Sequence, residues 1–349
     1  MIKKNLFGVI PNCGDSYSYT IFDEKGQNVV LSDYGCTILQ INVLDKNNKL
    51  RDVALGYDLL HDYLNDKRYF GATIGRYANR IANAEFALND EIFHLAQNDG
   101  KNHLHGGVKG FSRKLFKSTI KDDNSVMFQY FSPDMEEGYP GNFNLNVTAS
   151  FINGTLKFNY QYLSDKDTPA NITNHNYFNL NGHGTGNIFS HTFVINANEY
   201  CHSDSGLLAL APLAPVENTP FDFRTPKKLF DGISSHSKEI IGAFGGYDHC
   251  FKVNHENNNN NFVASSVGDV SGIKLEVFSD MPAVQFYTGN QIGVTQGKNG
   301  ELYNSFDGFA LECQHFPNAM NEPRFNDTQA VIKAGTLNET FIEFKFTND

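Results

Sequence analysis

The chain is 349 residues long, and its 28 Lys and Arg against 39 Asp and Glu give a formal net charge of −11. Nucleic-acid binding needs clustered Lys and Arg to contact phosphates, and because no such cluster occurs the composition argues against a nucleic-acid partner. A strongly anionic ligand is also disfavoured unless a local basic pocket exists. Thirty Phe and sixteen Tyr, with no Trp, suit pleated, half-buried strands better than helices.

The cysteines and the N-terminus bear on the compartment. The cysteines are scattered, odd in number and without a CxxC pair, at Cys13, Cys36, Cys201, Cys250 and Cys313. This usage favours a reducing compartment and no disulfide framework. The first apolar run, Leu6 to Ile10, is too short for an export signal, and no stretch approaches the apolar length that spans a bilayer. We therefore expect a cytoplasmic protein with no membrane contact.

Alternating apolar and polar residues predict strands along most of the chain. In chain order the predicted strands are 28–43, 115–119, 126–131, 145–151, 156–162, 192–195, 273–278, 283–287, 309–313 and 340–346. Asn153-Gly154 separates two of these runs and predicts a tight hairpin. Helical periodicity is scarce and is confined to a turn or two at 58–63 and 226–230.

Many strands and few short helices predict an all-β fold, a large antiparallel β-sandwich or barrel. No linker or fixed-period repeat interrupts residues 1–349, so we expect one domain. Five consecutive asparagines at 257–261 are interpreted as a solvated loop tip between strands.

The first polar motif in the chain is the segment 71–80, which holds two glycines and two arginines. A phosphate-binding P-loop is excluded because there is no GKS/T and no strand-then-helix context. Two interpretations stay open: a structural turn with surface arginines, or hydrogen bonds from Asn79 and Arg80 to hydroxyl groups of a ligand.

The second motif is Asn102-His103-Leu104-His105-Gly106-Gly107. If it lies on a strand, both imidazoles share one face, as they would in a metal site. No carboxylate follows in 106–110 to complete such a site, so metal is the least favoured interpretation. A packed histidine and a hydrogen bond to a substrate remain as alternatives.

The third motif surrounds His175 with Asn174, Asn176 and Tyr177. Pro169 and the turn-prone 181–182 flank it, which predicts a loop at the rim of the sandwich. An imidazole with an ordinary pKa of about 6.5 can give or take a proton near neutrality. A lone histidine is nevertheless more often structural.

Two acids follow downstream. Asp248 ends a Gly-Gly-Tyr-Asp turn, which is a weak signal because Asp after Gly is common in turns. Glu312 lies in an apolar run, and strand alternation places it opposite Leu311 and Cys313. It faces either solvent or a cleft, and burial in a cleft would raise its pKa toward the range of a general base.

Taken together, these segments resemble the aldose 1-epimerase (galactose mutarotase) family along nearly the whole chain. The motifs that carry the resemblance are GRYANRI at 75–81, NHLHGG at 102–107, TNHNYFNL at 173–180, GGYDH at 245–249, VQFYTGN at 284–290 and LECQHFPNA at 311–319. The resemblance implies a single galactose mutarotase-like supersandwich with an open sugar cleft. Two positions depart from the family pattern, Asn176 in place of Ser or Thr and Cys313 in place of Thr.

The resemblance also implies roles for individual residues. Glu312 is expected to be the general base and His175 the general acid. The expected substrate-binding residues are Asn79, Arg80, His105, Tyr177, Asp248 and Gln285. No metal or cofactor is implied, since ring opening and reclosure of a sugar are proton transfers. We expect the α and β anomers of free galactose or glucose to be interconverted by a monomer or weak homodimer.

These roles predict a bell-shaped pH profile, because the base must be ionised while the acid is protonated. Ordinary pKa values allow this between about 4.3 and 6.5. Burial would raise the Glu312 value, and a nearby anion would raise that of His175. The alternatives are a hexose-6-phosphate 1-epimerase, which needs a basic subsite, a glycoside hydrolase, which usually needs two carboxylates, and a non-catalytic carbohydrate-binding protein.

Overall fold

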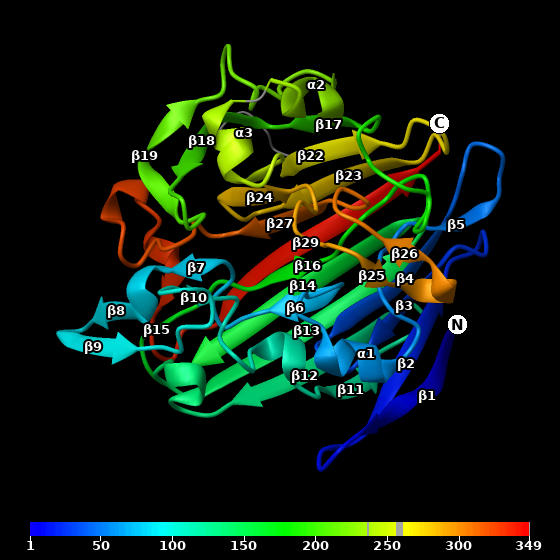
Figure 1. The fold of residues 1–349 in the computed structure, drawn as a ribbon. Helices are drawn as coiled ribbons and strands as arrows, with labels where there is room; N and C mark the ends of the chain where they lie inside the picture. The colour runs from blue at the N-terminus through cyan, green and yellow to red at the C-terminus, as the bar shows by residue number, and fades with distance from the viewer. Residues whose placement is uncertain (236, 256–260, 349) are drawn as a thin grey trace.

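The structure is a computed structural model that describes residues 1–235, 237–255 and 261–348. Its largest element is a nine-stranded sheet in which every neighbouring pair is antiparallel (Figure 1). In spatial order its strands are β11 (Lys117–Ile120), β12 (Ser125–Ser132), β13 (Phe143–Ile152), β14 (Thr155–Ser164), β29 (Asn338–Thr347), β23 (Lys274–Ser279), β22 (Phe262–Val267), β17 (Thr192–Ile195) and β20 (Lys227–Lys228).

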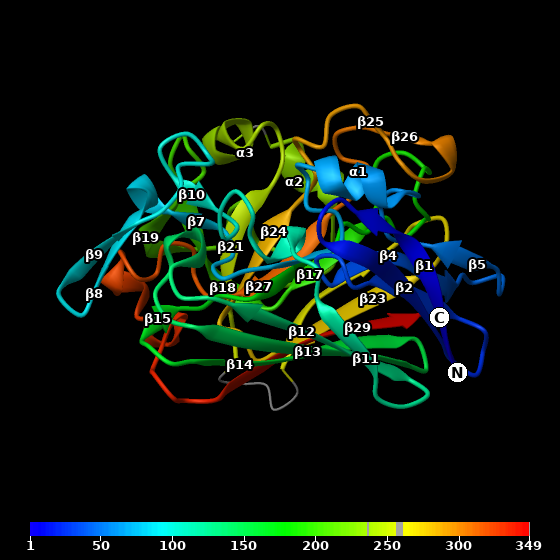
Figure 2. The same ribbon diagram turned by 90° about the horizontal axis from the view of Figure 1, so that it is seen from below.

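Two five-stranded antiparallel sheets lie against the nine-stranded one. The first is made of β1 (Ile2–Ile10), β2 (Gly14–Phe22), β3 (Asn28–Ser32), β4 (Thr37–Leu44) and β5 (Leu50–Asp52), in chain order. The second runs β19 (Ala209–Pro215), β18 (Ala197–Ser203), β21 (Asp248–Val253), β24 (Ala283–Tyr287) and β27 (Ala310–Gln314). Figure 2 shows the nine-stranded sheet on one side of the molecule and helices α1 (Leu60–Asn65) and α3 (Lys238–Gly242) on the other.

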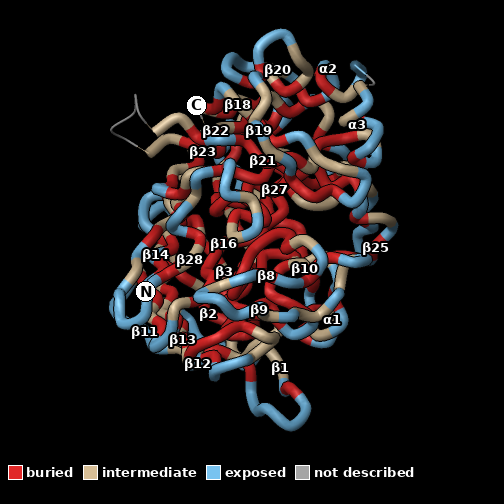
Figure 3. Tube along the Cα trace, turned by 90° about the vertical axis from the view of Figure 1, so that its left-hand side faces the viewer, coloured by how far each residue is buried: buried red, intermediate tan, exposed pale blue. Residues whose placement is uncertain are grey.

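The core fills the space between these layers. One apolar cluster takes Tyr19 and Ile21 from β2, Phe158 and Tyr160 from β14, and Phe286 from β24, all at most 1% exposed. The alternation that predicted the strands is the cause, because every second side chain of each strand points into this layer. Figure 3 shows the buried segments in the middle of the molecule and the exposed ones in the turns around it.

Short two-stranded ladders accompany these three sheets. They are β6 (Ala72–Ile74) with β16 (Thr173–His175), β7 (Arg80–Ile81) with β10 (His103–Leu104), β8 (Glu85–Leu88) with β9 (Glu91–His94), β15 (Thr168–Pro169) with β28 (Val331–Ile332), and β25 (Thr295–Gln296) with β26 (Leu302–Tyr303). The pair β6–β16 matters most for function. It is tied to the first sheet through Gly71, whose carbonyl accepts from the Ile38 N–H, and to the start of β27 through the bridge of Phe178 to Phe309.

The all-β antiparallel sandwich predicted from the sequence is confirmed. The Asn153-Gly154 hairpin is also confirmed: Ile152 pairs with Thr155, and both turn residues have the positive φ that this turn type requires. The predicted strand 28–43 is wrong in one respect, because a turn with Cys36 at φ 45° divides it into β3 and β4.

Helices are short, as expected. Helix α1 confirms the turn or two of helix predicted at 58–63, two residues further on, and α2 (Leu229–Ile233) overlaps the one predicted at 226–230. Single 3-10 turns span Ala82–Ala84, Phe111–Arg113, Glu136–Gly138, Lys298–Gly300, Pro323–Phe325 and Thr328–Ala330. The asparagine run predicted to be a loop tip lies, except for its last residue, outside the described residues. Within the described chain, no helix has the length and apolar character needed to cross a bilayer.

Candidate active site

A cleft of about 590 Å³ collects polar side chains from segments that are far apart in the sequence. This volume is typical of a pocket for a small molecule. The lining residues are Lys67, Arg68, Tyr69, Asn79, Arg80, Leu104, His105, His175, Tyr177, Asp248, Tyr287, Gln291 and Glu312. Every site residue predicted from the sequence is among them except Gln285.

Part of the cleft is built on one face of the second five-stranded sheet. In the β24–β27 ladder Glu312 pairs with Gln285, and in the β21–β24 ladder Asp248 pairs with Tyr287. Directly paired residues share a face, as do residues two apart in a strand, so all four side chains point the same way. The prediction that Glu312 faces away from Leu311 and Cys313 is confirmed, since those two lie in the apolar core.

His175 enters the cleft from β16, which lies beside β27 (Figure 1). The prediction of a rim loop is wrong: His175 is the last residue of a strand, pairs with Ala72 and is 4% exposed. Its Nε2 lies 3.6 Å from Oε1 of Glu312. This separation is longer than a hydrogen bond and leaves both atoms available to a ligand. The ring also packs at 5.0 Å from that of Tyr177.

Asn79, Arg80 and His105 form another part of the wall. The Nδ1 of His105 accepts the Asn79 backbone N–H at 3.2 Å. A neutral imidazole that accepts at Nδ1 carries its proton on Nε2, so His105 offers a donor to a ligand. Arg80 is held by Nε–H donation to Asp99 at 2.7 Å and by Nη1 donation to the Leu207 carbonyl at 3.3 Å.

The two histidines of the NHLHGG motif do not share a face. Strand β10 ends at Leu104, and His105 has a φ of 51°, which turns the chain out of the strand. His103 is not among the cleft residues. Its Nδ1 contacts the Ala96 carbonyl at 2.8 Å, and its ring packs on Tyr139. His103 is therefore a packed core histidine and His105 alone belongs to the cleft.

Burial sets the electrostatics of Glu312. The side chain is 2% exposed, and removal from water raises its pKa well above the usual range. The neighbouring Asp248 carboxylate raises this pKa further, and the Arg80 guanidinium opposes the rise. The predicted upward shift is confirmed.

His175 shifts in the opposite direction from the expectation. Desolvation lowers its pKa to about 4, and the carboxylate nearby does not reverse this effect. The reason is that burial also favours the neutral form of Glu312, which then supplies little negative charge. In the ligand-free protein burial therefore favours the uncharged form of both groups.

Several buried polar atoms of the site have no hydrogen-bond partner in the described part of the chain. They are Nδ1 of His175, Oε2 of Glu312 and Oε1 of Gln285. Buried polar groups are normally paired, so a cluster of unpaired ones indicates a place where a ligand or water completes the bonds. Gln285 acts one step back from the cleft, because its Nε2 donates to Asp248 Oδ1 at 2.6 Å.

The sequence interpretation missed six cleft residues: Lys67, Arg68, Tyr69, Leu104, Tyr287 and Gln291. The sequence contains a signal for Tyr287, because this residue lies two positions after Gln285 in the same strand and so shares its face. Lys67, Arg68 and Tyr69 belong to the irregular turn between α1 and β6, which no periodic pattern marks.

Among the described residues, His105, His175 and Glu312 form one group whose ligand-type atoms lie within 4.8 Å of one another. Such a group has the composition of a cation site. The Arg80 guanidinium, however, is close enough to affect the pKa of both His105 and Glu312. A positive charge already at this position disfavours a second one, and we interpret the group as proton donors and acceptors.

The chain matches known proteins over almost its whole length. The model of the family described as aldose 1-epimerase matches residues 17–344. Over 349 residues the chain is 38% identical to the galactose mutarotase of Homo sapiens, covering 99% of this chain and 98% of that protein. It is 39% identical, also over 349 residues, to the aldose 1-epimerase of Haemophilus influenzae, covering 99% and 100%.

Solved structures agree with the architecture. The galactose 1-epimerase from Lactobacillus acidophilus superposes with a TM-score of 0.85 at 26% identity, covering 99% of this chain and 98% of that one. An aldose epimerase homologue from C. elegans superposes with a TM-score of 0.88, covering 95% and 99%, and at 24% identity this likeness concerns the fold alone.

Proposed function

Since this chain belongs to the aldose 1-epimerase family and interconverts the anomers of free aldoses, we propose that Glu312 and His175 carry the protons of that reaction. The observation that supports this assignment is the 3.6 Å separation of Glu312 Oε1 and His175 Nε2 in a sugar-sized cleft. An acid and a base at this distance can contact the O1 hydroxyl and the ring oxygen of one hemiacetal.

The reaction opens and recloses the sugar ring. Glu312 takes the proton of O1, His175 gives a proton to O5, the C1–O5 bond breaks and C1 becomes an aldehyde. Rotation about the C1–C2 bond presents the other face of the carbonyl. O5 then attacks C1, His175 takes back its proton and Glu312 returns one to O1. The two roles are exchanged between opening and closure, so the pair needs one proton in total.

In the ligand-free site the proton is favoured on Glu312, because burial raises the pKa of the carboxyl and lowers that of His175. This arrangement equals the one that follows ring opening. For a closed sugar to react, the proton must move to His175. The O1 hydroxyl favours this move when it binds, because hydrogen-bond donation to a carboxylate stabilises the ionised form.

The other predicted residues hold the sugar in place. Arg80 and the Nε2–H of His105 are donors, Asp248 is an acceptor, and Asn79 and Tyr177 complete the wall. We propose that Gln285 positions the Asp248 carboxylate and does not touch the sugar, given its 2.6 Å bond to Asp248. Fixed hydroxyls keep the rest of the molecule still while the aldehyde rotates.

The proposed substrates are galactose and glucose, the first being the sugar in the names of the mammalian relatives. The five cysteines are all unpaired, which fits a reducing compartment such as the cytoplasm. We propose that the protein works there as a monomer or weak homodimer.

Polarimetry on freshly dissolved α-galactose tests the assignment. The wild-type protein should accelerate the approach to the anomeric equilibrium, and His175→Asn should lower kcat by about 10²-fold or more, because a positioned acid typically contributes that much. Saturable galactose binding with no acceleration by the wild type would leave only a carbohydrate-binding role. Release of sugar from an aryl galactoside would instead indicate a glycoside hydrolase.

A further inference from the structure

Two cations at the mouth of the cleft are not used by the mechanism. Lys67 and Arg68 follow α1 and line the cleft next to Tyr69. Within the described part of the chain neither forms an ion pair with a carboxylate, whereas the third cation of the cleft, Arg80, is paired with Asp99. Arg68 Nε donates to the Ile292 carbonyl at 2.7 Å, and its side chain also hydrogen-bonds Tyr57.

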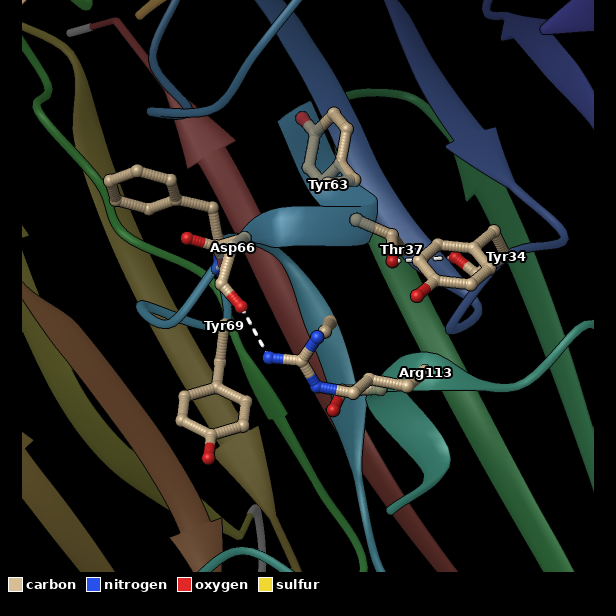
Figure 4. A pocket seen from close by; sticks show the side chains of 9 residues that line it. Tyr34, Thr37, Tyr63, Asp66, Tyr69 and Arg113 are labelled. Atoms are coloured by element: carbon tan, nitrogen blue, oxygen red, sulfur yellow. Dashed lines mark hydrogen bonds between the residues drawn. The ribbon is translucent and has the colours of Figure 1, made fainter. Parts of the chain in front are cut away.

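The turn that carries these cations is firmly held. The Asp66 carboxylate accepts the backbone N–H groups of Arg68 and Phe70 at 2.9 and 3.1 Å. The Arg113 guanidinium donates to the Asp66 carbonyl at 2.5 Å and to the Leu64 carbonyl at 3.2 Å. Figure 4 shows Arg113 reaching from a separate segment to Asp66. Lys67 and Arg68 therefore project from a fixed backbone, which lowers the entropy cost of binding a ligand there.

The charge balance of the cleft favours an anion at this position. The chain as a whole is strongly acidic, with a net charge of −11. Inside the cleft, burial disfavours the charged form of Glu312, so Asp248 is the one lining carboxylate that opposes Lys67, Arg68 and Arg80. Unpaired positive charge is thus concentrated at the mouth of the cleft on an otherwise negative protein, and such a field attracts and orients anions.

We propose that Lys67 and Arg68 form a subsite for an anionic substituent of the aldose, a phosphate or a carboxylate carried away from C1. The inference rests on the proposed function, because the reaction at C1 and O5 is the same and the anion only binds. It identifies the basic pocket that an anionic substrate requires and that the sequence motifs do not reveal. Lys offers a point charge and Arg a fork of donors, and both are used to bind phosphates and carboxylates.

The test compares substrates within one enzyme. Mutarotation of galactose, galactose 6-phosphate and galacturonate is followed at low ionic strength for the wild type and for Lys67→Gln, Arg68→Gln and the double variant. Each variant should lower the ratio of kcat/KM for an anionic sugar to kcat/KM for galactose by roughly tenfold, the effect of one charge-assisted hydrogen bond. A drop for the phosphate alone or for the carboxylate alone identifies which anion the subsite takes.

The controls separate this subsite from other effects. Lys25→Gln, in the exposed turn between β2 and β3, removes the same charge and should leave the ratio unaltered. High salt should reduce the ratio in the wild type by screening the mouth of the cleft. Wild-type activity on galactose with none on either anionic sugar, or an unaltered ratio in the double variant, overturns the subsite. If the wild type does not accelerate galactose mutarotation, the proposed function itself is overturned.

Discussion

Glu312 and His175 each lie where charge is disfavoured, and this shared property determines how the pair titrates. Groups that interact this closely lose their protons in steps that belong to the pair rather than to either residue. The active form holds one proton, so it exists above the pKa of about 4 for His175 and below the raised pKa of Glu312.

This gives the first prediction, on the pH dependence of kcat/KM for galactose. Activity should fall as the pH drops through about 4, because His175 is then protonated while Glu312 still holds its proton, and the pair carries two. It should fall again only well above the ordinary pKa of a carboxyl, where Glu312 loses the shared proton. Initial rates of galactose mutarotation check this when they are measured from about three pH units below to about three above the ordinary pKa of histidine. A maximum confined to the interval between the ordinary pKa values, about 4.3 to 6.5, would contradict it.

The second prediction concerns Asp248→Asn. The Asp248 charge raises the pKa of Glu312, so its removal should lower that pKa and move the alkaline limb of the kcat/KM profile to lower pH. The height of the profile should also fall, because a sugar contact is lost. The pH at which the alkaline limb falls does not depend on the lost sugar contact. An alkaline limb that stays in place or moves to higher pH would contradict the assignment.

How much of the site the sequence predicts differs from residue to residue. Glu312 follows from strand alternation, because Leu311 and Cys313 occupy the opposite face. The strand of His175 is hidden, since the residues around it are polar and its burial depends on pairing with β6, about a hundred positions earlier. Lys67 has no pattern at all, because its position depends on bonds made by Arg113 and Asp66.

At the scale of elements, the β25–β26 arm is joined to the first sheet by a buried ion pair. Lys298 Nζ lies 2.5 Å from Asp52 Oδ2 and donates to the Leu39 carbonyl at 2.9 Å. The other carboxylate oxygen of Asp52 accepts the N–H groups of Ile41 and Ala54. The Lys298 side chain is 1% exposed, so its charge depends on this partner.

The third prediction is that Asp52→Ala lowers the free energy of unfolding by about 3–5 kcal/mol, because it leaves the Lys298 charge buried without compensation. Urea unfolding measures the change. Glu199→Ala removes the exposed pair with Lys252 and should cost no more than about 1 kcal/mol. Equal effects of the two substitutions would refute the account of Asp52.

Long strands can be predicted from the alternation of their own residues, whereas short strands cannot. Strands β13 and β14 have ten residues each, with regular alternation and an Asn-Gly turn between them. The ladders β6–β16 and β7–β10 have two or three residues per strand, too few to show a period. These short ladders carry Arg80 and His175, so local patterns miss part of the site while the strand of Glu312 is predicted.

At the scale of the molecule, the C-terminal strand β29 lies in the middle of the nine-stranded sheet, between β14 and β23. The last residues of the chain therefore hold together its two halves. On this basis we propose that residues 1–349 form a single domain, in which the five-stranded sheets share one apolar cluster with the nine-stranded sheet.

The fourth prediction is a single thermal unfolding transition in which the calorimetric and van't Hoff enthalpies agree. Because β29 pairs with both β14 and β23, neither half of the nine-stranded sheet can unfold without disrupting the pairing of the other. Differential scanning calorimetry at several scan rates measures this. Two resolved transitions, or a van't Hoff enthalpy about half the calorimetric one, would mean two folding units.

The meeting of residues 175 and 312 is also a property of the whole molecule. No local pattern relates two segments so far apart, and it was the resemblance to a family that predicted their roles. The structure supplies the physical reason: bridges of Phe178 to Ala54 and Phe309 bring β16 beside β27. The proton assignment within the pair depends on burial, which only the assembled fold determines.

The most direct test of proton transfer by this pair is kcat for α-galactose mutarotation by Glu312→Gln. Gln has the shape of a protonated carboxyl, the form of Glu312 that burial favours, so the fold and KM should change little. It cannot take or return a proton, so kcat should fall by about 10²–10⁴-fold. A kcat within tenfold of the wild type would contradict the role of Glu312, and with it the mechanism.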